Sequence, residues 1–300
     1  MPLLLASYES VVGFNSVHKQ TFSYRYMTQP LLFHKTYLHP TSKEWVVFVH
    51  GAGGSSSIWF KQIKDYKRHF NLLLIDLRGH GKSNQLLKEL ITSRYTFTAI
   101  TQDILKVLDH LKIQSAHFVG MSLGTIIVRN LAEMASERVR SMVLGGAVTR
   151  LNIRSQILVK LGNLSKHFLP YMWLYKLFAY IVMPQKSQRE SRHLFIREAK
   201  KLCEKEFKRW FILAADVNPL MRYFKDRELP IPTLYLMGDR DYMFIKPVKE
   251  MVAAHHESVL HEIPDCGHVC NVERPDDFNQ RSIAFIKQQS QSAQRLELGH

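Results

Sequence analysis

The stretch Gly120-Met121-Ser122-Leu123-Gly124 constrains the fold of this chain more than any other part of its sequence. It follows an apolar run typical of a buried strand, residues 116–119, and precedes a helical pattern that begins at Thr125. A serine between two glycines at such a junction predicts a turn so tight that side chains at positions 120 and 124 would collide with the neighbouring strand and helix. We expect this strained turn to hold the Ser122 hydroxyl out of the backbone, at a helix N-terminus whose dipole favours a developing negative charge.

Eight short, largely apolar segments predict the strands of one sheet. They are residues 21–27, 32–39, 45–49, 72–75, 116–119, 141–144, 232–237 and 258–263. Helical patterns fall between them, at residues 97–111, 125–135, 246–254 and 276–287. Continuous apolar runs are typical of strands that are buried on both faces of a parallel sheet. The alternation therefore predicts an α/β fold with a mostly parallel, eight-stranded sheet flanked by helices, which binds ligands beyond the carboxyl ends of its strands.

The alternation stops between residues 149 and 229, where only helical patterns remain. One predicted helix lies between Pro170 and Pro184 and is apolar all round, so we expect most of its surface to be covered. A long amphipathic helix is predicted after Ser187, with an apolar face from Phe195 to Trp210. We interpret residues 149–229 as a helical cap (a lid) inserted into a core of residues 1–148 and 230–290, followed by a loose tail at residues 291–300.

Composition indicates the compartment and the partners. Three cysteines are too few for a disulfide framework and the N-terminus lacks the basic segment of a secretion signal, so we expect a cytoplasmic protein. The net charge is +15, and fourteen Lys/Arg against four Glu between Arg150 and Trp210 supply +10 of it. This excess indicates either a solvated helical surface or one that attracts anionic lipid, an anionic substrate or an acidic partner. No nucleic-acid-binding motif accompanies it, so no nucleic-acid partner is predicted, and no feature predicts an oligomeric state.

Five motifs follow predicted strands of the sheet. They are His50-Gly51-Ala52-Gly53-Gly54, Asp76-Leu77-Arg78-Gly79-His80-Gly81-Lys82-Ser83, Gly120 to Gly124, Gly238-Asp239-Arg240-Asp241 and Gly267-His268. Together they resemble the α/β-hydrolase superfamily, in its capped, carboxylesterase-like branch. The resemblance extends from about residue 21 to residue 287, apart from the cap. It implies the α/β-hydrolase fold and a catalytic triad, but it does not specify the substrate.

The resemblance implies that Ser122 is a nucleophile in a nucleophile elbow. A serine hydroxyl is a weak nucleophile, so a base must take its proton. In this superfamily the order along the chain is Ser, then acid, then His, which selects His268 in the Gly-His turn after the last predicted strand. His255, His256 and His261 compete with it, and surface or packing roles suffice for all three.

Two aspartates compete for the acid of the triad. The family pattern G-x-x-D selects Asp241, whereas Asp239 is interpreted as a residue that binds the backbone of its own turn. The resemblance also implies an oxyanion hole made of two backbone N–H groups, those of Ala52 and Leu123. We expect His50 to brace the loop that carries Ala52.

The implied function is hydrolysis of a carboxylic ester through an acyl-enzyme, with no metal and no cofactor. Cys266, His268 and Cys270 lack a nearby fourth ligand, so no zinc site is predicted. The apolar, aromatic cap favours a small apolar or aromatic ester as substrate. Thioester and carbon–carbon bond hydrolysis remain open because the same triad supports them. Two further hypotheses are a lysophospholipase or lipase that reaches anionic membrane surfaces through its basic cap, and a ligand-binding signalling protein on the hydrolase fold.

Overall fold

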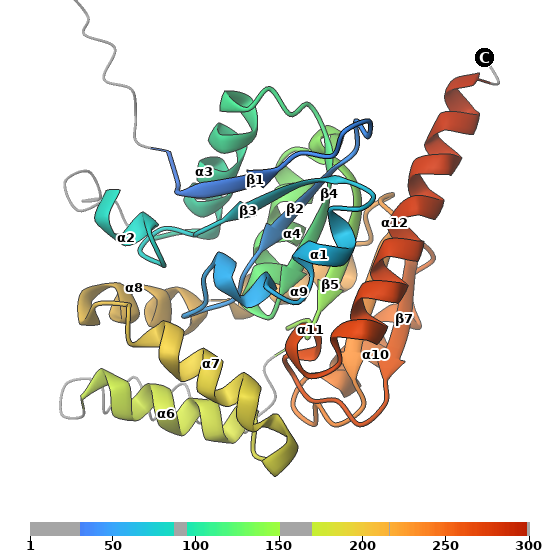
Figure 1. Ribbon diagram of the computed structural model, residues 1–300. Coiled ribbons are helices and arrows are strands. Elements are labelled where there is room, and N and C mark those ends of the chain that lie inside the picture. The colour runs from blue at the N-terminus through green and yellow to red at the C-terminus, as the bar shows by residue number, and fades with distance from the viewer. Residues whose placement is uncertain (1–30, 87–94, 151–169, 216, 299–300) are drawn as a thin grey trace, which may run out of the picture.

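The computed structural model describes residues 31–86, 95–150, 170–215 and 217–298 (Figure 1). Its strands are β1 (His34–Tyr37), β2 (Trp45–Val49), β3 (Asn71–Ile75), β4 (Ala116–Met121), β5 (Val139–Gly145), β6 (Thr233–Gly238) and β7 (Ser258–Ile263). They form a seven-stranded sheet in the order β1-β3-β2-β4-β5-β6-β7, in which only β1 runs antiparallel to its neighbour. All seven were expected from the sequence, and the eighth expected strand, residues 21–27, lies outside the described residues.

Helices cover both faces of the sheet (Figure 1). Those of the core are η1 (Ser56–Trp59), α1 (Ile63–Tyr66), α2 (Ser83–Leu86), α3 (Phe97–His110), α4 (Leu123–Met134), η2 (Ser136–Arg138), α10 (Ile245–Val252), α11 (Cys270–Glu273) and α12 (Pro275–Leu298). Between β5 and β6 the described chain forms helices only: α6 (Tyr171–Val182), η3 (Lys186–Gln188), α7 (Arg189–Ala199), α8 (Glu204–Ala215) and α9 (Asn218–Asp226).

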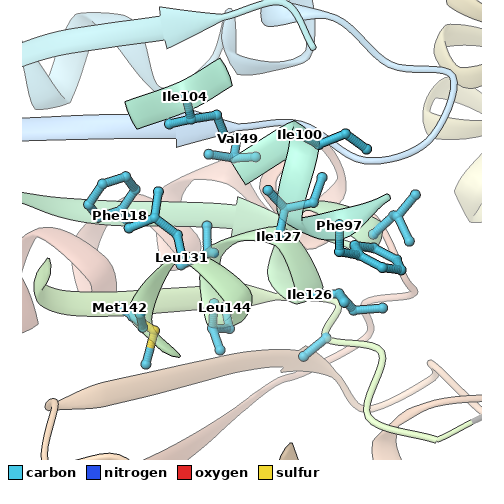
Figure 2. Close-up of a cluster of buried hydrophobic side chains, with 14 of the residues drawn as sticks. Val49, Phe97, Ile100, Ile104, Phe118, Ile126, Ile127, Leu131, Met142 and Leu144 are labelled. Atoms are coloured by element: carbon cyan, nitrogen blue, oxygen red, sulfur yellow. The ribbon is translucent and has the colours of Figure 1, made fainter. Parts of the chain in front are cut away.

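Strands β2 and β3 carry apolar side chains on both faces, as their unbroken apolar runs predicted. In β2, Val47 and Val49 join a cluster with α3 and α4, whereas Val46 and Phe48 join a cluster with η1 and α12 on the opposite face. Successive side chains of a strand point to opposite sides, so a strand covered on both faces needs an apolar residue at every position. Figure 2 shows the first cluster, in which isoleucines of α3 and α4 and Phe118 of β4 take part.

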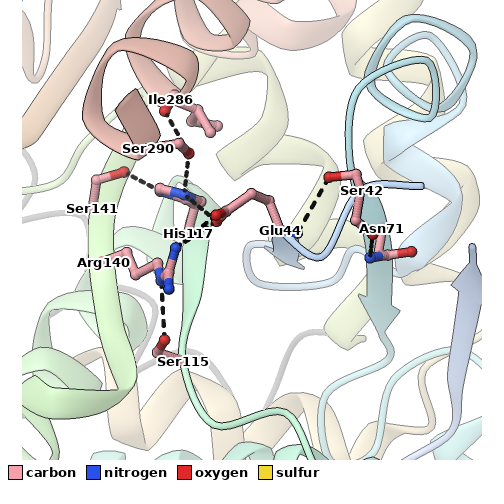
Figure 3. A network of polar contacts seen from close by, with 9 residues as sticks. All are labelled: Ser42, Glu44, Asn71, Ser115, His117, Arg140, Ser141, Ile286 and Ser290. Atoms are coloured by element: carbon pink, nitrogen blue, oxygen red, sulfur yellow. Dashed lines mark hydrogen bonds and ion pairs between the residues drawn. The ribbon is translucent and has the colours of Figure 1, made fainter. Parts of the chain in front are cut away.

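A polar network lies at the amino-terminal side of the sheet (Figure 3). His117 of β4 is 1% exposed; its Nδ1 lies 2.7 Å from Ser141 Oγ and its Nε2 lies 3.1 Å from Ser290 Oγ of α12. Glu44 lies 3.3 Å from the same Nε2 and accepts two hydrogen bonds from Arg140. The hydrogen bond with His117 and then the Arg140 charge lower the pKa of Glu44. This network ties α12 to the sheet at the end opposite to the five motifs.

Two expectations about helices are wrong. The predicted loose tail at residues 291–300 is helical as far as Leu298, because no Gly or Pro interrupts α12 before residue 299. The single amphipathic helix predicted after Ser187 is divided into α7 and α8. The amides of Lys201 and Leu202 bond to carbonyls three residues earlier, which tightens the last turn of α7 and buries Leu202.

Among the described residues, helix α6 is covered on one side, although its apolar sequence predicted burial of most of its surface. Tyr175, Ala179 and Val182 are buried against the rest of the protein. On the opposite side, Trp173 is 70% exposed and Leu177 is 53% exposed. Within the described residues, no helix combines the length and the apolar character that crossing a membrane requires.

Candidate active site

Ser122 occupies the turn between β4 and α4 with φ 53° and ψ −122°, a backbone conformation that non-glycine residues rarely adopt. A Cβ added to Gly120 would lie 2.9 Å from the carbonyl oxygen of Gly124, and one added to Gly124 would overlap the carbonyl of Val49. Both glycines are therefore required for β4, α4 and β2 to approach this closely. Strain of this type costs on the order of 1–3 kcal/mol and persists only where the surrounding structure enforces it.

Neighbouring groups hold the strained serine in place. The Ser122 amide donates to the carbonyl of Gly145 in β5, at 3.0 Å. The Ser122 carbonyl accepts two hydrogen bonds from Thr125, one from its amide at 2.9 Å and one from its hydroxyl at 2.6 Å. With its backbone fixed on both sides, Ser122 keeps its side chain directed away from the turn.

The imidazole of His268 connects Ser122 to Asp241. His268 Nε2 lies 2.9 Å from Ser122 Oγ, and its Nδ1 lies 2.8 Å from Asp241 Oδ2. His268 is 5% exposed and Asp241 is 1% exposed, so water screens this pair little. With its proton on Nδ1, His268 donates to the carboxylate, and its Nε2 is free to accept the serine proton. The structure thus brings together the serine, the histidine and the acid that the sequence analysis selected.

The structure separates the two competing aspartates. Asp241 lies in the turn after β6, where its amide donates to the carbonyl of Gly238 and its side chain faces His268. Asp239, two residues earlier, is exposed, and its Oδ1 accepts the amide of Cys266 at 3.1 Å. Asp239 therefore holds the loop that leads to His268 and does not contact the imidazole itself.

The three competing histidines lie elsewhere. His255 Nε2 lies 3.1 Å from the carbonyl of Lys225, and His256 is exposed. His261 Nε2 lies 3.5 Å from Asp277 Oδ2 on α12. These contacts fit the surface and packing roles that the sequence indicated for them.

The loop after β2 lies directly against the elbow. A Cβ added to Gly51 would lie 3.0 Å from Ser122 Cβ and 3.5 Å from the amide nitrogen of Leu123. Among the loop and cap hydrogen bonds between described residues, neither the Ala52 amide nor the Leu123 amide serves as a donor. Leu123 opens α4, and the first amides of a helix have no partner within it. The two expected oxyanion donors therefore lie on adjoining backbone segments beside Ser122.

His50 braces this loop, as expected. Its Nδ1 donates to the carbonyl of Gly51 at 2.8 Å, and its Nε2 accepts the amide of Leu77 at 3.0 Å. Complete burial lowers the pKa of His50, which keeps the ring neutral and leaves one nitrogen able to accept. The ring thus joins the loop after β2 to the loop after β3.

Glu273 is a functional candidate that the sequence analysis missed. Its carboxylate accepts the amide of Gly267 at 2.7 Å and that of Val269 at 3.3 Å, so it holds the backbone on both sides of His268. Glu273 belongs to α11, and its side chain reaches back to the residues that precede this short helix. The signal available in the sequence was weak: a single glutamate in a four-residue helix whose N-cap, Val269, has no side chain that could cap it.

Cys266 and Cys270 are buried, and burial raises the pKa of both thiols. Their sulfur atoms face the backbone carbonyls of Gly267 and Leu236. In the part of the chain that the structure describes, no group of three His, Cys, Asp or Glu side chains is placed to hold a metal ion.

Comparison with known proteins points to the same fold. Residues 44–172 match the family described as alpha/beta hydrolase fold. The 3-oxoadipate enol-lactonase 1 of Acinetobacter baylyi is 24% identical over 260 residues, which cover 83% of this chain and 90% of the relative. The carboxylesterase YbfK of Bacillus subtilis is 23% identical over 257 residues, which cover 82% and 81%.

Solved structures share the same architecture. The esterase EaEST from Exiguobacterium antarcticum aligns with a TM-score of 0.73 at 17% identity, over 86% of this chain and 98% of that one. The enol-lactonase from Burkholderia xenovorans LB400 aligns with a TM-score of 0.70 at 20% identity, over 85% and 96%. The sheet order, the strained serine turn and these similarities agree, and the chain has the α/β-hydrolase fold.

Proposed function

We propose that this chain is a serine hydrolase that cleaves carboxylic esters, with Ser122, His268 and Asp241 as its catalytic triad. The observation that carries the proposal is the continuous line of contacts from Asp241 through His268 to Ser122, at 2.8 and 2.9 Å. These distances lie within the hydrogen-bond reach that a general base needs. The relatives support the same class, since their names identify lactonases and carboxylesterases, which are hydrolases acting on ester bonds.

In the proposed mechanism, Ser122 Oγ attacks the ester carbonyl carbon while His268 Nε2 takes its proton. The carbonyl oxygen becomes an oxyanion, which accepts hydrogen bonds from the amides of Ala52 and Leu123. The carbon–oxygen bond to the alcohol then breaks, and His268 gives its proton to the leaving alkoxide. Asp241 holds the imidazole in the correct tautomer and stabilises its charged form.

The acyl-enzyme is released by the reverse sequence with water in place of the alcohol. His268 removes a proton from the water, whose oxygen attacks the acyl carbon, and the bond to Ser122 Oγ breaks as His268 returns the proton to the serine. Every proton in the proposed cycle passes through Nε2 of His268. The proposed reaction requires no metal and no cofactor, because the triad and the two amides supply the base, the nucleophile and the oxyanion donors.

We also propose that residues 149–229 form a cap over this site and favour a small ester with apolar or aromatic groups. In support, Tyr175 of α6 donates a hydrogen bond to the carbonyl of Ala52, and Trp210 of α8 donates one to the carbonyl of Arg78. Both carbonyls belong to loops at the carboxyl ends of strands. The helices between β5 and β6 therefore contact the loops beside the proposed nucleophile, and their aromatic composition suits an apolar substrate.

A covalent probe tests the proposal directly. We expect a fluorophosphonate to label Ser122 and to abolish turnover of p-nitrophenyl esters in proportion to labelling, because phosphonylation requires an activated serine and an oxyanion hole. Peptide mapping by mass spectrometry locates the label, and a panel of graded acyl length identifies the preferred chain. Absence of labelling together with absence of turnover across the panel would support a ligand-binding protein instead.

A second candidate is a lysophospholipase or lipase that acts at anionic membrane surfaces, which the exposed side of α6 favours. Trp173, Leu177 and Tyr180 recur at positions i, i+4 and i+7, and are 70%, 53% and 53% exposed. Such spacing places them on one face of the helix, with exposed Lys176 beside them. Aromatic and basic side chains on one face are typical of helices that lie at a membrane interface. From α6 to α8 the exposed lysines and arginines outnumber the exposed acidic residues, which are Glu190 and Glu204. The exposed lysines and arginines are Lys176, Lys186, Arg189, Arg197, Lys200, Lys201 and Lys205.

Vesicle binding separates this candidate from a purely soluble esterase. We expect the double variant Trp173→Ser with Leu177→Ser to bind phosphatidylserine-containing vesicles at least about tenfold more weakly than the wild type, because burial of a large apolar side chain contributes about 1.5–3 kcal/mol. The matched control removes two equally exposed apolar residues elsewhere, Leu38→Ser with Val259→Ser, and should bind like the wild type. Wild-type binding that is absent, or that ignores both salt and lipid charge, would exclude the membrane-surface candidate.

A further inference from the structure

The peptide unit that joins Ala52 to Gly53 is hydrogen-bonded at both of its ends. The carbonyl of Ala52 accepts the hydroxyl of Tyr175 at 2.9 Å, and the amide of Gly53 donates to Nε2 of His80 at 2.8 Å. We infer that Tyr175 and His80 are positioning residues, which together hold the turn that presents the Ala52 amide to the oxyanion. This inference rests on the proposed function, and it adds two positioning residues to the proposed triad and oxyanion donors.

We call the pair of hydrogen bonds that join Tyr175 and His80 to this peptide unit the clamp. The geometry of the turn shows why the clamp matters. The amide of Gly54 donates to the carbonyl of Gly51 at 3.1 Å, which closes a four-residue turn with Ala52 and Gly53 at its centre. Gly53 has φ 67°, as the third residue of a type II turn requires. Type I and type II turns differ by a rotation of the central peptide of roughly half a turn. In this loop the central peptide is the unit that Tyr175 and His80 hold, so their two hydrogen bonds select one of the two forms.

Tyr175 is well placed to act as a fixed donor. It is 5% exposed, its ring stacks on Phe195 at a centroid distance of 4.6 Å, and Phe207 contacts it edge-on at 5.8 Å. Burial raises the pKa of the Tyr175 phenol well above its ordinary value, so the hydroxyl keeps its proton. A Cβ added to Gly53 would overlap the Tyr175 hydroxyl, which shows how closely the ring approaches the turn.

His80 is well placed to act as a fixed acceptor. It is 1% exposed, and its Nδ1 donates to the carbonyl of Arg78 at 3.1 Å, which leaves Nε2 without a proton and able to accept the Gly53 amide. Burial is the main cause that lowers the pKa of His80 well below its ordinary value, so the ring stays neutral. Trp210 contacts the ring edge-on at 4.7 Å and donates to the same Arg78 carbonyl.

The two residues hold the turn from separate parts of the protein. His80 belongs to the loop after β3, within the core, whereas Tyr175 belongs to α6, between β5 and β6. The donor geometry beside Ser122 therefore depends on how α6 packs against the core. A displacement of about 1 Å at a catalytic group can cost two orders of magnitude in rate, so a clamp of this kind affects turnover without contacting the substrate.

The test begins with Tyr175→Phe, which removes the hydroxyl and keeps the stacked ring. We expect kcat for a chromogenic ester to fall about 10-fold with KM within twofold, because the donor is misplaced and not removed. The inhibition constant of phenylboronic acid should rise by the same factor, since its tetrahedral anion requires the oxyanion hole. The matched control is Tyr171→Phe, one turn earlier in α6, whose hydroxyl donates to the carbonyl of Leu202 at 3.1 Å. It should leave kcat within twofold.

His80 is tested by loss and rescue. His80→Leu removes the acceptor and should lower kcat about 10-fold, whereas His80→Gln places a carbonyl oxygen near the position of Nε2 and should restore most of the activity. The double variant of Tyr175→Phe with His80→Leu should lose much less than the product of the single losses, because both act on one peptide unit. Two results would overturn the inference. One is a double variant whose loss of kcat equals the product of the single losses; the other is a His80→Gln variant that unfolds at the wild-type temperature but remains as slow as His80→Leu.

A readout independent of turnover separates this inference from the proposed function. Amide hydrogen exchange of the peptide spanning residues 50–57 should accelerate in Tyr175→Phe and remain unchanged in Tyr171→Phe. If the wild type neither hydrolyses esters nor reacts with a fluorophosphonate, the proposed function fails, and exchange still reports on the clamp. If the wild type is active and Tyr175→Phe changes neither exchange nor kcat, the clamp alone fails.

Discussion

Ser122→Ala is expected to lower kcat for p-nitrophenyl esters by at least about 10⁴-fold, because no other group in the proposed mechanism can form the acyl-enzyme. His268 and Asp241 would remain in place but would have no nucleophile to activate. The rate that survives should come from the oxyanion hole and substrate binding alone. Initial rates with purified protein give the measurement, and loss of the fluorophosphonate label at position 122 gives an independent one.

The control for this variant is Ser57→Ala, which removes an exposed serine hydroxyl from helix η1, directly after the loop that follows β2. It should retain activity within about twofold. Both variants should unfold at nearly the wild-type temperature, since neither removes buried apolar surface. Turnover by Ser122→Ala within tenfold of the wild type would disprove the assignment of the nucleophile.

Asp241→Asn is expected to lower kcat about 10³- to 10⁴-fold with little change in the fold. An asparagine side chain can direct its amide NH₂ group at Nδ1 of His268, and the imidazole then places its own proton on Nε2, where it can no longer accept from Ser122. The carboxylate charge that stabilises the imidazolium is lost as well. Steady-state kinetics with the ester preferred by the wild type give the measurement.

Asp239→Asn is the matched control, two residues earlier in the same turn. Its carbonyl oxygen can still accept the amide of Cys266, so we expect activity within about threefold of the wild type. The pair of variants tests the selection of Asp241 over Asp239 that the sequence pattern predicted. Equal losses in both, or the larger loss in Asp239→Asn, would contradict the role proposed for Asp241.

Local patterns were sufficient to predict most of the sheet and the elbow. The sequence of β2 is one apolar run because both faces of this strand are covered. Ser122 is followed two residues later by a glycine because a side chain at position 124 would overlap the carbonyl of Val49. Both features depend on residues close together in the chain or on the fixed geometry of a strand and a helix. Such features leave a residue pattern that can be recognised in a single sequence.

Local patterns failed where a helix terminus or a helix face depended on distant contacts. The sequence after Ser187 is amphipathic throughout, yet α7 ends at Ala199 and α8 begins at Glu204, because Leu202 turns into the protein between them. Helix α6 carries apolar residues on all sides, yet Trp173 faces solvent. Periodicity reports how apolar a face is, but it does not report which partner covers it.

The sequence by itself predicted the α/β-hydrolase fold, the strained turn at Ser122 and the His268 candidate, because glycine spacing and motif order are local properties of the chain. The family pattern had selected Asp241 over Asp239, and the structure places Asp241 against His268 and Asp239 against the Cys266 amide. Only the tertiary structure revealed that Glu273, Tyr175 and His80 hold the loops around the site. Those contacts join residues far apart in the chain or depend on which way a turn directs a side chain. A hydrogen bond of 2.9 Å between Tyr175 and Ala52 exists only once α6 has packed against the loop after β2.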